Sequence, residues 1–199
     1  MTKHFIDLDD FQKNDIRQIL DYANKIKFNQ IDFDNALLNK SLGMIFEQLS
    51  LRTRLSFDIA MKKMGGYVVE LDPKLIGLEK RESNSDIIRT ISQYLDCIMI
   101  RNLDHERLKL FASYDYLSII NGLSNYSHPC QILSDIFTIE EKKGLIENQK
   151  ITWCGDITNV CTSLLQASNV FKFKLNLSAP KQVITQNQAL LDKYKSDNI

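Results

Sequence analysis

The sequence lacks an excess of charge of either sign, since 25 Lys and Arg residues balance 25 Asp and Glu residues. General nucleic-acid binding usually requires a basic excess, so the composition excludes that class of protein. Any anion that binds must be held by a local cluster of donors, because the chain has no global positive field. With 44% hydrophobic and 25% charged residues, the composition is otherwise that of a soluble globular protein.

Cysteine is scarce, and the sequence contains no C-x-x-C pair. The four cysteines are Cys97, Cys130, Cys154 and Cys161, and three of them lie in apolar runs. Without paired ligands, the sequence predicts no structural zinc and no other metal site. We expect reduced thiols in the core of a cytoplasmic protein.

Targeting, membrane and dinucleotide-binding signals are also missing. Residues 1–10 show no basic-then-apolar leader pattern. No apolar run approaches the ~20 residues that a membrane span needs. The G-x-G-x-x-G fingerprint is absent as well, so no dinucleotide site is indicated. We expect a cytoplasmic protein with no cofactor and no membrane or nucleic-acid partner.

Apolar residues alternate between helical spacing and short strand-like runs. Helices are predicted over 10–26, 55–64, 87–95, 106–114, 131–143, 160–171 and 186–195, and strands over 44–46, 67–71, 97–100, 117–120, 150–154 and 174–177. This alternation predicts an α/β fold in which helices cover both faces of parallel sheets. Two such αβα domains are expected, over residues 1–149 and 150–199. The second offers few elements and should be incomplete.

Ligands of parallel sheets bind beyond the carboxyl ends of the strands, so the residues that follow each strand are informative. After the first strand come Ser50, Leu51, Arg52 and Thr53, which open directly into a helix. A helix N-terminus, two hydroxyl groups and a guanidinium group together suit a phosphate. The alternative is an ordinary capped helix start with surface arginines.

Later strand ends add further polar groups. Arg101 follows one strand directly, where it either faces a ligand or is a solvated end residue. A polar loop after the next strand carries His128 and Gln131. Their side chains can bond to a carbonyl oxygen and an amide, although a His-Pro turn that caps a helix explains the histidine equally well. A Gly155-Asp156 pair after the fifth strand is weak evidence by itself.

Taken together, these segments resemble the aspartate/ornithine carbamoyltransferase family. Residues 46–54 resemble its F-E-x-x-S-T-R-T-R phosphate motif, with Leu51 in place of the usual threonine. Glu82-Ser83, the strand end at Arg101, and residues 128–131 (H-P-C-Q) also match in order and spacing. The resemblance covers essentially the whole chain. It implies a homotrimer in which neighbouring subunits share sites.

The resemblance also implies roles for individual residues. Ser50, Leu51, Arg52 and Thr53 would hold the phosphate of carbamoyl phosphate. Arg101 and His128 would polarise the carbamoyl carbonyl, and Gln131 would hold the amine, with Pro129 and Cys130 completing that binding segment. Arg52, Arg101 and His128 would be the catalytic residues. Gly77 stands where the family usually offers a glutamine to the neighbouring site.

Two segments favour ornithine over aspartate as the acceptor. Residues 121–124 (N-G-L-S), which lead into the H-P-C-Q segment, are similar to the ornithine-specific members. So are residues 155–159, where Asn159 matches the asparagine that binds ornithine and Thr158 departs from the pattern. The implied reaction is carbamoyl transfer from carbamoyl phosphate to the side-chain amine of L-ornithine, giving L-citrulline and phosphate in arginine metabolism.

The family's remaining ornithine-binding motifs do not occur before Ile199, so we expect a truncated second domain. Two alternatives therefore stay open. The chain could bind carbamoyl phosphate without transferring its carbamoyl group, or it could serve another amine such as putrescine.

Overall fold

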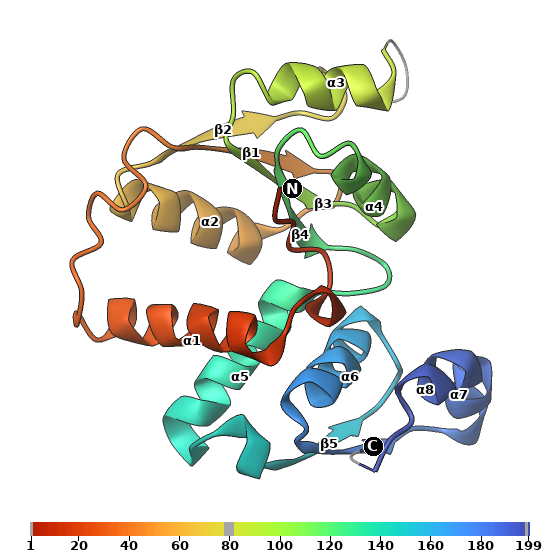
Figure 1. Cartoon of the computed structure of the whole chain (residues 1–199). Coiled ribbons are helices and arrows are strands. Elements are labelled where there is room, and N and C mark those ends of the chain that lie inside the picture. The colour runs from red at the N-terminus through yellow and green to blue at the C-terminus, as the bar shows by residue number, and fades with distance from the viewer. Residues whose placement is uncertain (1, 78–81, 198) are drawn as a thin grey trace. The chain divides into compact units, whose positions relative to one another are not determined.

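The computed structural model describes residues 2–77, 82–197 and 199. The chain forms two compact units. Unit 1 comprises Met1–Ile6 and Lys25–Ser124, and unit 2 comprises Asp7–Asn24 and Asn125–Ile199. Each contains a parallel sheet with helices, so the predicted α/β class is confirmed (Figure 1). The predicted domain boundary between residues 149 and 150 stays a prediction.

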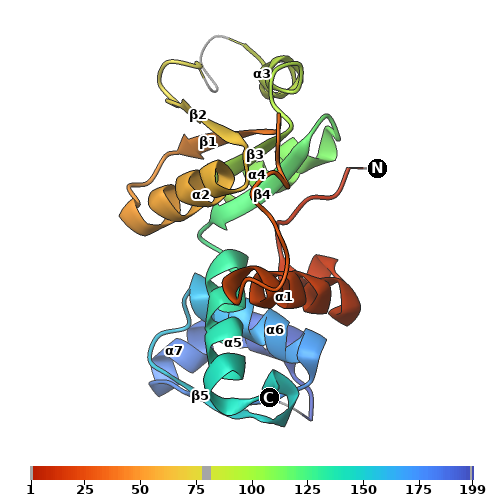
Figure 2. The ribbon, with the colours of Figure 1, turned by 90° about the vertical axis from the view of Figure 1, so that its left-hand side faces the viewer.

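Unit 1 is built on a four-stranded parallel sheet. Its strands are β1 (Ser41–Phe46), β2 (Tyr67–Leu71), β3 (Cys97–Arg101) and β4 (Ser118–Leu123), in the order β2-β1-β3-β4. Its helices are α2 (Leu51–Lys63), α3 (Asn84–Ile91) and α4 (His105–Ser113). An N-terminal segment extends the sheet, because Phe5 bridges to Ile120 in parallel (Figure 2).

The helices of unit 1 cover both faces of the sheet. Side chains alternate along β3, as they must in a strand. Ile98 and Ile100 pack in one cluster with buried residues of α3 and α4. Met99 packs in a second cluster with Met61 of α2. All four are fully or almost fully buried, so β3 is the centre of the unit's core.

Unit 2 is organised around one almost wholly buried helix, α6 (Asn159–Phe171), whose residues 161–168 are all buried. Such a helix must be covered all round. It contacts the 3-10 turn η1 (Leu8–Asp10), α5 (Pro129–Lys143), β6 (Lys174–Ser178) and α8 (Gln188–Tyr194). The other elements are α1 (Lys13–Lys27), the 3-10 turn η2 (Ile146–Asn148), β5 (Lys150–Cys154), which pairs with β6, and α7 (Lys181–Gln186).

Several details differ from the predictions, and two of them have a clear physical reason. The predicted helix over 186–195 is interrupted at Asn187, whose side-chain amide donates to the Val183 carbonyl at 2.9 Å. This bond to the backbone competes with continuation of the helix. Cys154 was expected in the core but is exposed, because β5 turns residues 150, 152 and 154 toward solvent. All four cysteines are free thiols.

No helix in the described part of the chain combines the length and the apolar character that crossing a membrane requires.

Asp96 should make the stability of unit 1 depend on pH. It accepts hydrogen bonds from the Lys40 ammonium at 2.8 Å and from the Ser41 amide and hydroxyl at 2.8 and 2.9 Å. These bonds, that of Lys40 above all, lower the pKa of Asp96 from 3.8 to about 2. A lowered folded-state pKa stabilises the fold above the unfolded-state pKa and ceases to do so as the pH falls toward the folded-state pKa.

We therefore expect Asp96→Asn to remove part of the stability loss between about pH 4 and pH 2. Urea unfolding of both proteins at several pH values measures this. Parallel losses of unfolding free energy across that window would show that Asp96 contributes nothing to it.

Candidate functional site

The loop after β1 leads into α2 through a capped turn. Ser50 is the N-cap residue, and its hydroxyl oxygen accepts the Thr53 amide hydrogen at 3.3 Å. This cap explains why α2 begins at Leu51, four residues before the predicted start. The first amides of a helix have no partner within it, and its dipole is positive at this end. Residues 50–53 thus form the kind of turn that suits an anion.

Arg101 lies beside this turn. It is the last residue of β3, and its Nη1 donates to the Thr53 hydroxyl oxygen at 3.5 Å. Its Nε is buried and has no hydrogen-bond partner within the described chain. Burial lowers the pKa of the Arg101 guanidinium, and no carboxylate among the described residues offsets that effect. A buried donor without an acceptor is rare, and an anionic ligand would supply the acceptor.

Arg52 differs from Arg101 in its surroundings. Its side chain is exposed and makes no ion pair within the described residues. The structure therefore places Ser50, Thr53 and Arg101 together. Leu51 and Arg52 lie on the first turn of the same helix and point into more open space, with 72% of Leu51 exposed.

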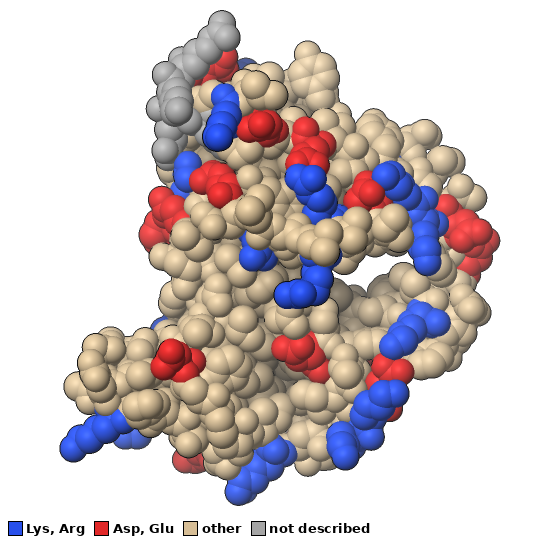
Figure 3. Space-filling view, turned by 180° about the vertical axis from the view of Figure 1, so that it is seen from behind, with Lys and Arg blue, Asp and Glu red and all other residues tan. Residues whose placement is uncertain are grey.

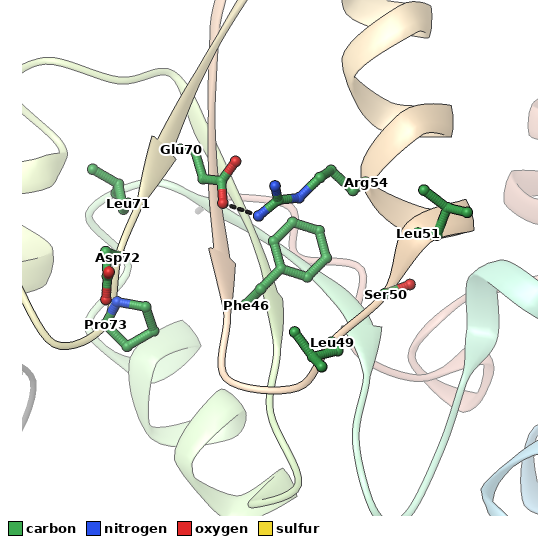
Figure 4. A pocket seen from close by; sticks show the side chains of 9 residues that line it. All are labelled: Phe46, Leu49, Ser50, Leu51, Arg54, Glu70, Leu71, Asp72 and Pro73. Carbon is green, nitrogen blue, oxygen red and sulfur yellow. Dashed lines mark hydrogen bonds and ion pairs between the residues drawn. The ribbon is translucent and has the colours of Figure 1, made fainter.

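A pocket of about 430 Å³ adjoins the turn on its β2 side. It is lined by Phe46, Leu49, Ser50, Leu51, Arg54, Glu70, Leu71, Asp72 and Pro73 (Figure 4). Arg54 lies over the Phe46 ring, 5.4 Å from its centroid, and forms an ion pair with Glu70. Because that pairing already balances the arginine's charge, the pocket suits an anion less well than the turn at Arg101 does.

The H-P-C-Q segment belongs to unit 2. His128 is buried and precedes α5, and Pro129 is the first helical residue, a position that tolerates its missing amide hydrogen. The His128 amide donates to the Ser163 hydroxyl at 2.8 Å. Ser163 lies one helical turn beyond Asn159 on α6. This bond therefore brings the starts of α5 and α6, and with them His128 and Asn159, into the same part of unit 2.

The next two residues of the segment are chemically different from His128. Burial raises the pKa of the Cys130 thiol to about 12, so it is not a thiolate at neutral pH. Gln131 is exposed, and its amide donates to the Asp135 carboxylate at 2.9 Å. Gly77 lies in the turn after β2 with φ of +69°, a conformation that glycine adopts without strain.

Ser163→Ala should lower the stability of unit 2 by about 1–3 kcal/mol, because it leaves the buried His128 amide without its acceptor. Chemical unfolding monitored by Trp153 fluorescence measures this, since Trp153 lies on β5 of the same unit. Ser134→Ala, at an exposed position of α5, is the control and should change stability by less than about 0.5 kcal/mol. Equal effects of the two substitutions would count against a special role for Ser163.

The sequence interpretation missed several polar contacts near these residues. They are the Arg54–Glu70 ion pair, the bonds that join Glu47 to Asn102 and Arg107, and the His128–Ser163 bond. Glu47 and Arg54 lie inside the phosphate-like motif, which could have drawn attention to them. No sequence signal marks Asn102, Arg107 or Ser163.

The charge distribution on the surface is mixed. On the face that Figure 3 shows, basic and acidic side chains are interspersed, and no single basic patch stands out. This agrees with the zero formal net charge of the sequence. Among the residues that the structure describes, no three His, Cys, Asp or Glu side chains are grouped to hold a metal ion.

Comparison with known proteins gives consistent matches. Residues 3–141 match the family described as aspartate/ornithine carbamoyltransferase, carbamoyl-P binding domain. An ornithine carbamoyltransferase of Ruthia magnifica is 40% identical over 196 residues, which are 98% of this chain and 65% of that protein. One of Rhodopseudomonas palustris is 38% identical over 199 residues and is covered to 64% of its length.

Solved structures agree with these matches. The ornithine carbamoyltransferase of Pyrococcus furiosus superposes with a TM-score of 0.85 at 34% identity, over 96% of this chain and 64% of that one. The ornithine carbamoyltransferase of Thermus thermophilus superposes with a TM-score of 0.87 at 29% identity, over 98% of this chain and 67% of that one. The chain spans about 65% of the length of the curated relatives that it matches. It belongs to the aspartate/ornithine carbamoyltransferase family.

Proposed function

We propose that this chain binds carbamoyl phosphate and transfers its carbamoyl group to the side-chain amine of L-ornithine, giving L-citrulline and phosphate. The observation that carries the proposal is the position of Arg101. Its buried Nε has no protein partner in the described chain, and its Nη1 approaches Thr53 at the start of α2. A phosphate with a carbonyl group attached offers acceptors to both the turn and the guanidinium.

The chemistry requires donors more than it requires a base. The neutral amine of ornithine attacks the carbonyl carbon, and a tetrahedral intermediate forms with negative charge on the oxygen. The C–O bond to phosphate then breaks, and the attacking nitrogen loses a proton to the leaving phosphate. Donors aimed at that oxygen stabilise the transition state, and each typically contributes about 2.7–4 kcal/mol. We assign this role to Arg101 and His128. Ser50, Leu51, Arg52 and Thr53 bind the leaving phosphate.

The other assignments rest on the family resemblance. Gln131 holds the carbamoyl amine, Pro129 and Cys130 shape the same segment, and Asn159 binds ornithine. Gly77 stands in the loop that other members offer to a neighbouring subunit. With these roles we also propose a cytoplasmic homotrimer that serves arginine biosynthesis, with a boundary between a carbamoyl-phosphate-binding domain and an ornithine-binding domain at residues 149 and 150.

Two measurements on the purified chain test the proposal. Calorimetric titration with carbamoyl phosphate should show binding, and incubation with carbamoyl phosphate and ornithine should form citrulline. Arg52→Ala should weaken binding at least tenfold. Lys63→Ala is the matched control, because it removes an exposed charge from the opposite end of α2 and should leave affinity unchanged.

The results of these measurements distinguish the proposed activity from its alternatives. Binding without citrulline formation would favour a carbamoyl-phosphate-binding protein that does not transfer the carbamoyl group to ornithine. Carbamoylation of putrescine in its place would favour the other acceptor. Absence of any binding by the folded chain would overturn the proposed function.

A further inference from the structure

Glu47 joins two other elements of unit 1 to the end of β1. One carboxylate oxygen accepts from Arg107 Nη2, on α4, at 2.9 Å. The other accepts from Asn102 Nδ2, just after β3, at 3.0 Å. The Glu47 amide in turn donates to the Arg101 carbonyl at 3.0 Å. We call Glu47, Asn102 and Arg107 the strand-end network.

Asn102 is the most constrained member of the strand-end network. Only 2% of its surface is exposed. Its amide nitrogen donates to the Leu123 carbonyl at 3.0 Å, and its side-chain oxygen accepts the Asp104 amide hydrogen at 2.7 Å. These bonds tie the end of β4 and the N-cap of α4 to the same point. Movement of Glu47 would therefore disturb several strand ends together.

The two charges of the network balance each other. The Arg107 side chain is 13% exposed and that of Glu47 is 23% exposed, so the pair is partly desolvated. The positive charge of Arg107 is consequently not offered to a phosphate. Removing one partner would leave the other charge uncompensated in this environment, which costs more than the loss of a surface pair.

The network borders both halves of the proposed phosphate site. Asn102 follows Arg101 directly, and Glu47 lies three residues before Ser50. Within the described chain, the Arg101 side chain has no carboxylate partner, and its bond to Thr53 is long at 3.5 Å. The orientation of the Arg101 side chain must therefore be set mainly by the backbone of Arg101. The carbonyl of that backbone accepts a hydrogen bond from the Glu47 amide.

We propose that Glu47 and Arg107 are positioning residues, which hold Arg101 against the phosphate-binding turn without touching the substrate. This inference rests on the proposed function, because it assigns the network to the same site. A purely stabilising network would change the unfolding free energy and leave the affinity of the folded protein unchanged. A positioning network changes both.

Glu47→Gln is the most informative variant. The glutamine side-chain oxygen can still accept a hydrogen bond from Asn102. The glutamine NH2 group, however, faces the N–H donors of Arg107, so the hydrogen bond to α4 is lost. Well below the unfolding temperature, we expect carbamoyl phosphate and inorganic phosphate to bind at least tenfold more weakly in calorimetry. Arg107→Lys, which keeps the charge, should retain more affinity than Arg107→Met.

Arg17→Met provides the matched control. Arg17 forms a comparably buried ion pair with Glu140 at 2.7 Å and with Glu147 at 3.0 Å, in unit 2. It should lower the unfolding temperature and leave phosphate affinity unchanged. If Glu47→Gln and Arg17→Met both destabilise the chain and neither weakens binding, the strand-end network is structural only and the inference is wrong.

A readout without ligand separates this inference from the proposed function. The buried Nε–H of Arg101 should exchange slowly with solvent in nitrogen-15 NMR, with its signal assigned through Arg101→Lys. Glu47→Gln should speed this exchange at least tenfold. If the parent chain fails to bind carbamoyl phosphate but the exchange responds, only the proposed function fails. If binding occurs and neither affinity nor exchange changes in the variant, only the inference fails.

Discussion

Replacing Arg101 with methionine is expected to weaken carbamoyl phosphate binding at least tenfold, while the stability of the folded chain stays the same or increases. The affinity should fall because a guanidinium bonded to an anion contributes about 1.5–3 kcal/mol, and a tenfold change corresponds to about 1.4 kcal/mol. Methionine fills a similar space but offers no donor.

The expected gain in stability follows from the surroundings of Arg101. Burial lowers the pKa of its guanidinium, which means that the fold disfavours the charged form. Among the residues that the structure describes, no carboxylate compensates for that effect and none accepts a hydrogen bond from the buried Nε. An arginine that is kept at a cost to the fold is typical of a binding residue.

Calorimetry and thermal unfolding on the same preparations measure both effects. Arg101→Lys is the control, since it keeps a positive charge and loses the fork of donors, and its affinity should lie between those of the parent and Arg101→Met. A variant that binds as tightly as the parent would remove Arg101 from the site. A fall in stability as large as the fall in affinity would mean that Arg101 mainly supports the fold.

The fold could be predicted from the sequence because the central strands of unit 1, β1 and β3, are buried on both faces. In runs such as Ile98-Met99-Ile100, apolar residues do not alternate with polar ones, and this pattern indicates a central strand of a parallel sheet. The edges of elements were harder to place. The start of α2 depends on a single hydrogen bond, which the Ser50 hydroxyl oxygen accepts from the Thr53 amide. The break before α8 depends on a single hydrogen bond that the Asn187 side chain donates to the Val183 carbonyl.

The candidate site was predictable to the extent that it follows strand ends. The strand-end rule identified Ser50, Thr53 and Arg101, and the structure brings these three together. Arg107 could not be found in this way, because a charged residue on a helix usually faces solvent. Its partner, Glu47, lies 60 positions earlier in the sequence. Spacing along one chain carries no information about such a pair.

Phe111→Ala should cost unit 1 about 3–5 kcal/mol, the usual effect of deleting a large aromatic side chain from a core. Phe111 is 1% exposed and packs in the cluster that joins α4 to the sheet, together with Ile98 and Ile119. Total stabilities of domains are about 5–15 kcal/mol, so this loss would be a large part of the whole. Because α4 carries Arg107, loosening this helix should also weaken phosphate binding.

Hydrogen exchange of the β3 amides is the suitable measurement, since the single tryptophan, Trp153, lies in unit 2 and does not report on unit 1. Protection of Ile98 and Ile100 should fall at least a hundredfold, which corresponds to about 2.8 kcal/mol. Leu110→Ala, one position earlier on α4 and 44% exposed, should change protection by less than about threefold.

If the two substitutions have equal effects, α4 is not held by Phe111, and the core described for unit 1 is incorrect at that helix. If Phe111→Ala lowers protection but phosphate affinity is unchanged, the position of α4 does not matter to the site, and the role assigned to Arg107 is contradicted as well.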